Sequence, residues 1–98
     1  DNIAASNTEA IANVTVPAKT PVIAGEEGIC KGCGVATLSI SYYDLGMTTG
    51  KMAAKILTGE ADISTMPIEF TTATPKYNAS MCETLGITPL EGYTAIAE

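Results

Sequence analysis

The hydrophobic residues in the middle of the chain recur with the period of an α-helix. Ser41 is a good N-cap for this helix, and Asp44, three residues later, completes a variant of the capping box. Gly59 stands where a helix often ends in a left-handed residue. The pattern therefore predicts a helix over residues 41–59. The residues that share its apolar face are Tyr42, Leu45, Thr49, Met52, Ala53, Ile56 and Leu57.

Two shorter helices are predicted near the ends of the chain. In residues 3–14 the hydrophobic residues fall near helical spacing, and Asp1 or Asn2 is placed to cap the helix. In residues 78–85 the helix is predicted by its ends, because Asn78 is a good cap and a glycine follows the last turn.

Three short apolar runs predict β-strands. Residues 21–24 form the first, residues 35–40 the second and residues 67–72 the third. Pro67 places the third strand near an edge of the sheet, because proline cannot donate a hydrogen bond to a strand ladder. Residues 26–34 are rich in glycine and polar groups and predict a loop or a short helix.

The order of these elements is helix, strand, loop, strand, helix, strand, helix. Such alternation is typical of α/β proteins, in which helices connect parallel strands. We therefore expect a mostly parallel sheet flanked by helices. The chain begins on a helix cap, where an α/β unit normally has a strand just before the helix. This start predicts that the sequence is truncated at its beginning.

Two glycines stand four residues apart within the central helix. Gly46 and Gly50 lower the propensity of this segment to be helical. They also permit close approach of another backbone. The cost in propensity predicts that a neighbouring element packs on the glycine face of the helix.

The composition narrows the function classes. The 98 residues carry a net charge of −6 and include no histidine and no arginine. Clustered cations are needed to bind phosphate backbones, so we expect no nucleic-acid partner. Histidine is the commonest metal ligand and the usual general base at neutral pH, so its absence disfavours a hydrolase or a zinc enzyme. We expect no enzymatic activity and no cofactor.

Several segments match, in order and spacing, a family of binding proteins. The chain resembles the ABC transporter substrate-binding proteins, a family that includes binders of tryptophan and other aromatic amino acids. The matching segments are DN at 1–2, TPVIA at 20–24, EEG at 26–28, GVATL at 34–38, YYDLGMTTGKMAAKILTGE at 42–60, MP at 66–67 and LGI at 85–87.

The resemblance implies a periplasmic-binding-protein-like fold of the first type, which is Rossmann-like. In such proteins two α/β lobes are joined by crossing strands and close on a ligand in the cleft between them. The chain would then be the C-terminal portion of such a protein. Residues 1–35 would belong to the second lobe, 36–41 would cross the hinge, the helix within 42–66 would pack on the first lobe, and 67–98 would supply a return strand and the C-terminal helix.

The resemblance also implies a function, a location and partners. The full-length protein would bind a small ligand, an amino acid and most simply an aromatic one, and would deliver it to an ABC permease. It would act outside the cytoplasm, in the periplasm or as a cell-surface lipoprotein. The isolated chain would expose one face of its central helix, and forming a homo-oligomer is one way to cover that face.

Polar residues follow two strands of the expected sheet and form the candidate ligand site. Ligands of doubly wound sheets bind at the carboxyl ends of strands, where Asp1 and Asn2 would follow a missing strand and Glu26 and Glu27 follow a strand of this chain. A carboxylate suits the ammonium group of an amino acid, and an amide can both donate and accept. For Asp1 and Asn2 the alternative is helix capping, and for the two glutamates it is a solvated loop. Glu27 is favoured over Glu26 because it precedes Gly28 as the family pattern expects.

A different function is suggested by the cysteines. Cys30 and Cys33 form a CxxC motif, and Cys82 is a third thiol, so a small thiol-redox or metal-binding protein is the alternative. A structural zinc site needs four ligands, and only three cysteines and no histidine are present. The motif lies in a glycine-rich segment, and the family pattern does not include it. We therefore expect free thiols or a local disulfide.

Overall fold

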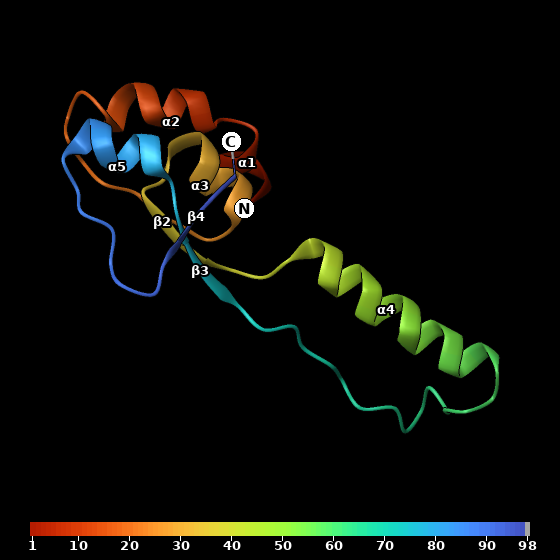
Figure 1. Cartoon of the computed structure of the whole chain (residues 1–98). Helices are drawn as coiled ribbons and strands as arrows, with labels where there is room; N and C mark the ends of the chain where they lie inside the picture. Colours follow the sequence, from red (N-terminus) through yellow and green to blue (C-terminus); the bar gives the residue numbers. More distant parts are fainter. Residues whose placement is uncertain (98) are drawn as a thin grey trace. The chain divides into compact units, whose positions relative to one another are not determined.

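The chain consists of two compact units. In a computed structural model, which describes residues 1–97, one unit contains residues 1–39 together with the C-terminal segment from Thr74 onward, and the other contains residues Ile40–Ala73. We refer to them as the sheet unit and the helical unit. Figure 1 shows the elements of each.

The sheet unit is built on a small mixed sheet, described here for the part of the chain that the structure covers. Its strands lie in the order β1-β2-β3-β4. The pairs β1–β2 and β3–β4 are parallel, and β2–β3 is antiparallel. The predicted α/β class with a mostly parallel sheet is confirmed. The strands are β1 (Ile23–Ala24), β2 (Ala36–Ser39), β3 (Thr74–Tyr77) and β4 (Thr94–Ala95).

The helices described in the sheet unit are α1 (Asn2–Ala5), α2 (Thr8–Thr15), α3 (Glu27–Cys33) and α5 (Ala79–Leu85). The last of these confirms its predicted ends. The Asn78 side chain accepts a hydrogen bond from the backbone N–H of Met81, and Gly86 has a left-handed φ of 68°.

The prediction of one continuous helix over residues 3–14 is wrong. The chain breaks into α1 and α2 around Ser6 and Asn7. The Ser6 hydroxyl donates to the carbonyl of Asn2, and the Asn7 amide donates to the carbonyl of Ile3 at 2.7 Å. Short polar side chains that bond to nearby carbonyls compete with regular helical bonding, which accounts for the break.

The core of the sheet unit surrounds α3. This helix packs against α2 and against the strands β1 and β2. Ala4, Ile11 and Ala12 from the two N-terminal helices pack against the core without being fully buried. The segment that follows β4 also contributes, although the sequence pattern gave no element there. The buried residues of this cluster are Ala24, Ile29, Cys30, Cys33 and Ile96.

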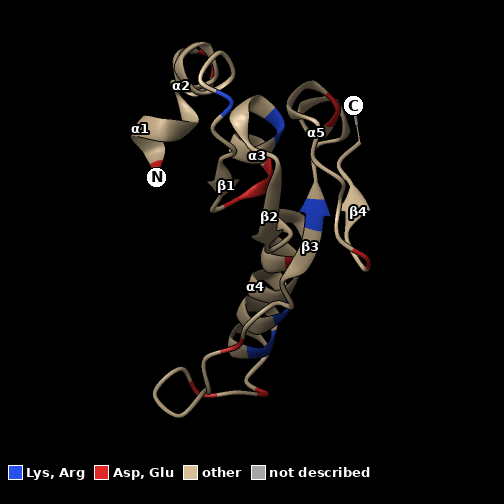
Figure 2. Cartoon of the chain, turned by 90° about the vertical axis from the view of Figure 1, so that its left-hand side faces the viewer, with Lys and Arg blue, Asp and Glu red and all other residues tan. Residues whose placement is uncertain are grey.

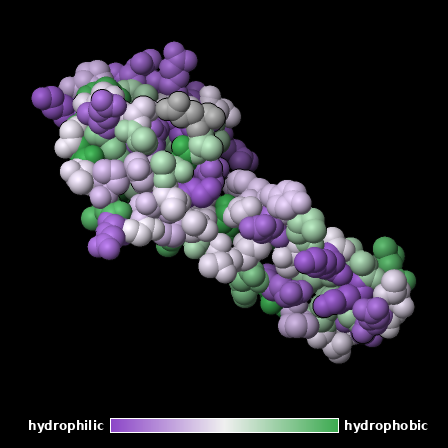
Figure 3. All heavy atoms as spheres, in the orientation of Figure 1, coloured by the Kyte–Doolittle hydropathy of each residue, from purple (hydrophilic) through white to green (hydrophobic). Residues whose placement is uncertain are grey.

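The helical unit has one long helix, α4 (Tyr42–Leu57), and a return segment. The Ser41 hydroxyl accepts a hydrogen bond from the backbone N–H of Asp44 at 3.1 Å, and Gly59 has a φ of 78°, so both predicted ends are confirmed. No residue of α4 is buried. The surface in Figure 3 shows hydrophobic residues of this unit among polar ones. In the part of the chain that the structure covers, no helix combines the length and apolarity needed to cross a membrane.

The third predicted strand is misplaced. Residues 67–72 are not a strand, and the strand that pairs with β2 is β3, a few residues later. The alternating Ile68 and Phe70 are 81% and 88% exposed. A strand needs a partner for its backbone groups, and within the described residues this segment has no strand beside it. The sequence pattern thus indicated an apolar segment here but not which segment pairs with β2.

Candidate functional site

Glu26 caps the helix that follows β1. Its side chain accepts hydrogen bonds from the backbone N–H groups of Gly28, at 3.0 Å, and of Ile29. These bonds satisfy two of the donors that every helix leaves free at its first turn. Of the two glutamates at this edge of the sheet, Glu26 is therefore committed to local structure.

Glu27 lies next to it, and its backbone and side chain are held by different strands. Its backbone N–H donates to the hydroxyl of Ser39 at the end of β2, at 3.1 Å. Its Oε2 accepts a hydrogen bond from Nζ of Lys76 on β3, at 2.7 Å. Figure 2 shows the acidic start of α3 in red and the basic segment of β3 in blue. The side chain of Glu27 keeps 38% of its surface exposed, so it remains open to a ligand.

Asp1 and Asn2 lie at the start of α1. The carboxylate of Asp1 accepts hydrogen bonds from the N–H groups of Ile3 and Ala4, at 2.8 and 3.2 Å, so the capping interpretation is confirmed. Both residues are exposed. The helix α1 that they begin contacts α3, the helix that begins with Glu27. A cap carboxylate that remains exposed is still accessible to a ligand.

The sequence reasoning missed Lys76 and the hydroxyl residues of β2. The register pairs Thr37 with Lys76, which places the two side chains on one face of the sheet. Thr37 and Ser39 share that face because they stand two residues apart on one strand. The Thr37 hydroxyl is buried and has no hydrogen-bond partner within the described residues. The period of two in β2 was a usable signal for the hydroxyls, but nothing local pointed to the lysine.

The cysteines form a buried group rather than a reactive site. The three cysteines are free thiols. Their exposed fractions are 0% for Cys30, 2% for Cys33 and 4% for Cys82. Burial, followed by the neighbouring thiols of Cys82 and Cys33, raises the pKa of Cys30 to about 11. Burial also raises the pKa values of the other two thiols. Within the described residues no group of cysteines and carboxylates is arranged to hold a metal ion. A thiol that stays protonated at neutral pH is a poor nucleophile and a poor metal ligand.

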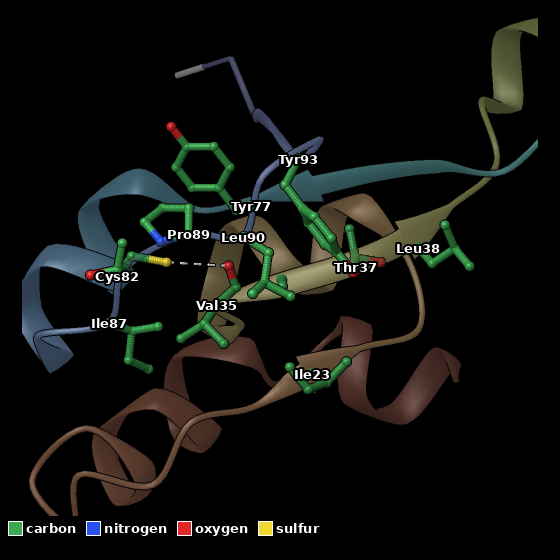
Figure 4. Close-up of a pocket in the computed structure, with 12 residues that line it drawn as sticks. Ile23, Val35, Thr37, Leu38, Tyr77, Cys82, Ile87, Pro89, Leu90 and Tyr93 are labelled. Carbon is green, nitrogen blue, oxygen red and sulfur yellow. Dashed lines mark hydrogen bonds between the residues drawn. The ribbon is translucent and has the colours of Figure 1, made fainter.

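The sheet unit also has an apolar cavity of about 220 Å³, and Thr37 is among the residues that line it. Figure 4 shows Ile23 and Leu38 from the strands and Ile87, Leu90 and Tyr93 from the C-terminal segment around it. Among residues 1–97, no charged side chain lines it. A cavity without charge cannot compensate the two ionic groups of an amino acid, so it is not the candidate site for a zwitterion.

Comparison with known families gives a match along the whole chain. A family model described as ABC transporter substrate binding protein matches residues 1–98. Among proteins of curated function, none matches.

Solved structures of similar fold come from three bacteria. A substrate-binding protein with adhesive properties from Clostridium difficile, in its ligand-free, open structure, is 31% identical with a TM-score of 0.76. An ABC domain from Streptococcus pneumoniae in complex with L-Trp is 28% identical with a TM-score of 0.82. A conserved domain protein from Vibrio cholerae is 28% identical with a TM-score of 0.78. The similarity covers 98%, 98% and 96% of this chain but only 33%, 34% and 34% of theirs, so this chain spans about one third of their length.

Proposed function

Because this chain belongs to the ABC transporter substrate-binding protein family, we propose that it is part of the solute-binding component of an ABC import system. The ligand is a small zwitterion, an amino acid and in the first instance an aromatic one. The observation that carries this proposal is the similarity, over 98% of the chain, to an ABC domain that holds L-Trp. The binding function requires no chemical step, and we propose no catalytic residue.

The division of the chain into two units supports the proposed lobe organisation. The chain leaves the sheet unit after β2 and returns to it in β3, and these two strands pair antiparallel. We propose that residues 1–35 belong to the second lobe and that 36–41 cross the hinge. In this proposal α4, within 42–66, packs on the first lobe, and 67–98 bring the chain back. The absence of any buried residue in α4 is what a helix that packs on a further lobe needs.

Glu27 is the residue best suited to the ammonium group of the ligand. One carboxylate oxygen is bound to Lys76, while Oε1 has no partner among the described residues. Asp1 and Asn2 add a second carboxylate and an amide on the adjacent helix, and Glu26 contributes negative charge while it caps α3. A charge-assisted hydrogen bond is the interaction that an ammonium group makes best with such a carboxylate.

The proposed location and partners follow from the family. The full-length protein acts outside the cytoplasm, in the periplasm or as a lipoprotein on the cell surface, and passes its ligand to an ABC permease. The alternative function, a thiol-redox or metal-binding protein that uses Cys30 and Cys33, is not supported by the burial of those thiols.

Calorimetric titration of the full-length protein with the twenty L-amino acids tests the proposal. We expect saturable binding of at least one of them, and we expect Glu27→Gln to weaken it by about tenfold or more, as for a lost hydrogen bond to a charged group. Glu83→Gln, which removes an exposed carboxylate from α5, is the matched control and should leave the affinity unchanged. If no amino acid binds, the proposed function is wrong. If Glu27→Gln binds like the wild type, the proposed site is wrong.

Asp1 needs a variant that separates its two roles. Asp1→Ser removes the carboxylate but keeps a side chain that caps helices well. Asp1→Asn keeps both the cap and the shape of the side chain. If Asp1 contacts the ligand, both variants should lose affinity to a similar degree while the thermal stability of the protein stays unchanged. Unchanged affinity in both would leave Asp1 as a cap alone.

A further inference from the structure

The ion pair between Glu27 and Lys76 has unused hydrogen-bonding capacity on both sides. The pair is formed through Oε2 of Glu27, and Oε1 has no partner among the described residues. The ammonium group of Lys76 carries three donors, and only the bond to Glu27 is formed within that part of the chain. About a third of each side chain is exposed, at 30% for Lys76 and 38% for Glu27. A free acceptor of Glu27 and free donors of Lys76 thus lie side by side.

This pair contributes little to the stability of the fold. Ion pairs that remain in contact with water gain little from their attraction, because solvent screens the charges and two long side chains must be ordered. The sheet unit already has its own core around α3. A role in recognition therefore explains the pair better than a role in folding does.

The surroundings of the pair hold both charges in place. Ser39 accepts the hydrogen bond of the Glu27 backbone, which fixes the start of the α3 helix against β2. Lys76 lies on β3 directly opposite Thr37, whose buried hydroxyl has no partner among the described residues. Charges anchored on strands and at a helix start lose less freedom when a ligand binds than charges on loops do.

From this arrangement we infer that Glu27 and Lys76 together form a receptor for the zwitterionic head group of the ligand. The inference rests on the proposed function and adds Lys76 as a residue that determines specificity. The ammonium group of the ligand binds to Oε1 of Glu27, and its carboxylate binds to the free donors of Lys76. Because the pair has no net charge, it favours a ligand with both charges over a ligand with only one.

The test compares three ligands that share an indole ring and differ in which ionic groups they carry. L-tryptophan carries both groups, tryptamine only the ammonium and indole-3-propionate only the carboxylate. Their affinities for the full-length protein are measured by calorimetry for the wild type and for the variants Lys76→Met, Lys76→Arg and Glu27→Gln. Lys19→Met, in an exposed loop of the same unit, is the control. If another amino acid of the twenty binds more tightly, that amino acid, its decarboxylated amine and its desamino acid replace the three.

We expect a different pattern for each variant. Lys76→Met should lower the affinity for L-tryptophan about tenfold, because a hydrogen bond to the carboxylate is lost. It should leave the affinity for tryptamine unchanged or higher, because a nearby positive charge has been removed. Lys76→Arg should retain most of the affinity for L-tryptophan. Glu27→Gln should weaken the binding of L-tryptophan and tryptamine. It should leave indole-3-propionate unchanged or bound more tightly, because a nearby negative charge has been removed. The control should match the wild type for all three ligands.

Three outcomes would overturn the inference. If Lys76→Met binds L-tryptophan like the wild type, the lysine is not part of the site, although the proposed function stands. If Lys76→Met weakens L-tryptophan and tryptamine equally, the lysine only supports Glu27 and does not bind the carboxylate. If the wild type binds none of the twenty amino acids, the proposed function fails and the inference fails with it.

Discussion

The sheet unit and the helical unit use the same local rules but differ in burial. Helices in both units begin at capping side chains, Asn78 for α5 and Ser41 for α4. Yet every buried residue that the structure describes belongs to the sheet unit, and the helical unit has none. Local signals therefore define where a helix starts and ends, whereas a core requires partners from elsewhere in the chain or beyond it. The comparison predicts that substitutions of the same kind will differ in effect between the units.

The largest difference should come from deleting an isoleucine side chain in each unit. Ile29→Ala removes a buried side chain from the core of the sheet unit and should lower the free energy of unfolding of the 98-residue chain by about 2–4 kcal/mol. Ile68→Ala removes a side chain that is 81% exposed and should change it by less than about 0.5 kcal/mol. Urea denaturation followed by circular dichroism gives both values. Equal losses would contradict the contrast between the units.

A second pair of variants compares a buried polar anchor with an exposed one. The side chain of Asn78 donates to the carbonyls of Cys30 and Lys31, both at 3.0 Å, and caps α5. Asn78→Ala leaves buried carbonyls without a partner and should cost about 2–3 kcal/mol in the same urea assay. Asn13→Ala, on the exposed side of α2, should be neutral. A neutral Asn78→Ala would mean that α3 and α5 are not joined in this way.

These outcomes bear on how much of the fold the sequence could predict. The caps Asp1, Ser41 and Asn78 were predicted and are confirmed, because a cap depends only on its own side chain and the next three residues. The strand expected over residues 67–72 was wrong, because pairing is decided by a segment far away in sequence. The break between α1 and α2 depended on side-chain bonds that hydrophobic periodicity does not record.

The ligand-binding role of the candidate site residues stays a prediction. The acidic residues of the site were named because they follow a strand, which is a local pattern. Lys76 was missed because it reaches Glu27 only through the antiparallel pairing of β3 with β2, across 49 positions of sequence. The cavity of the sheet unit and the packing of the segment after β4 could not be predicted either, because both depend on residues far apart in the sequence.

The stability of the sheet unit should depend on pH through its buried thiols. The pKa of Cys30 is raised from 9.0 to about 11, so the native state holds a proton that the unfolded state has already lost between these two values. The contribution of this group to the free energy of unfolding is therefore complete below about pH 9 and falls as pH rises toward 11, by at most about 3 kcal/mol. Urea denaturation at pH 8 and pH 10.5 measures the loss. In Cys30→Ala the free energy of unfolding should fall less between pH 8 and pH 10.5 than in the wild type. An equal fall would show that Cys30 does not cause the pH dependence.

The smallest effects should differ in sign between glycines of the two units. A Cβ at Gly34 would lie 2.9 Å from the Cα of Cys30, so Gly34→Ala must displace backbone and should cost about 1–2 kcal/mol. A Cβ at Gly50 would meet nothing within 4 Å, so Gly50→Ala should stabilise α4 in the isolated chain by about 0.5–1 kcal/mol. Urea denaturation and the helical circular dichroism signal report the two changes. Destabilisation by Gly50→Ala in the isolated chain would show that α4 already packs on something there.

We propose that this chain supplies only one side of a ligand site, and parallel calorimetry of two proteins tests this proposal. L-tryptophan and the other nineteen amino acids are titrated into the full-length protein and into the isolated 98-residue chain. We expect saturable binding of an amino acid by the full-length protein and binding at least about 100-fold weaker by the isolated chain, because interactions from the other lobe are missing. Equal affinity in the two proteins, or no binding by the full-length protein, would contradict it.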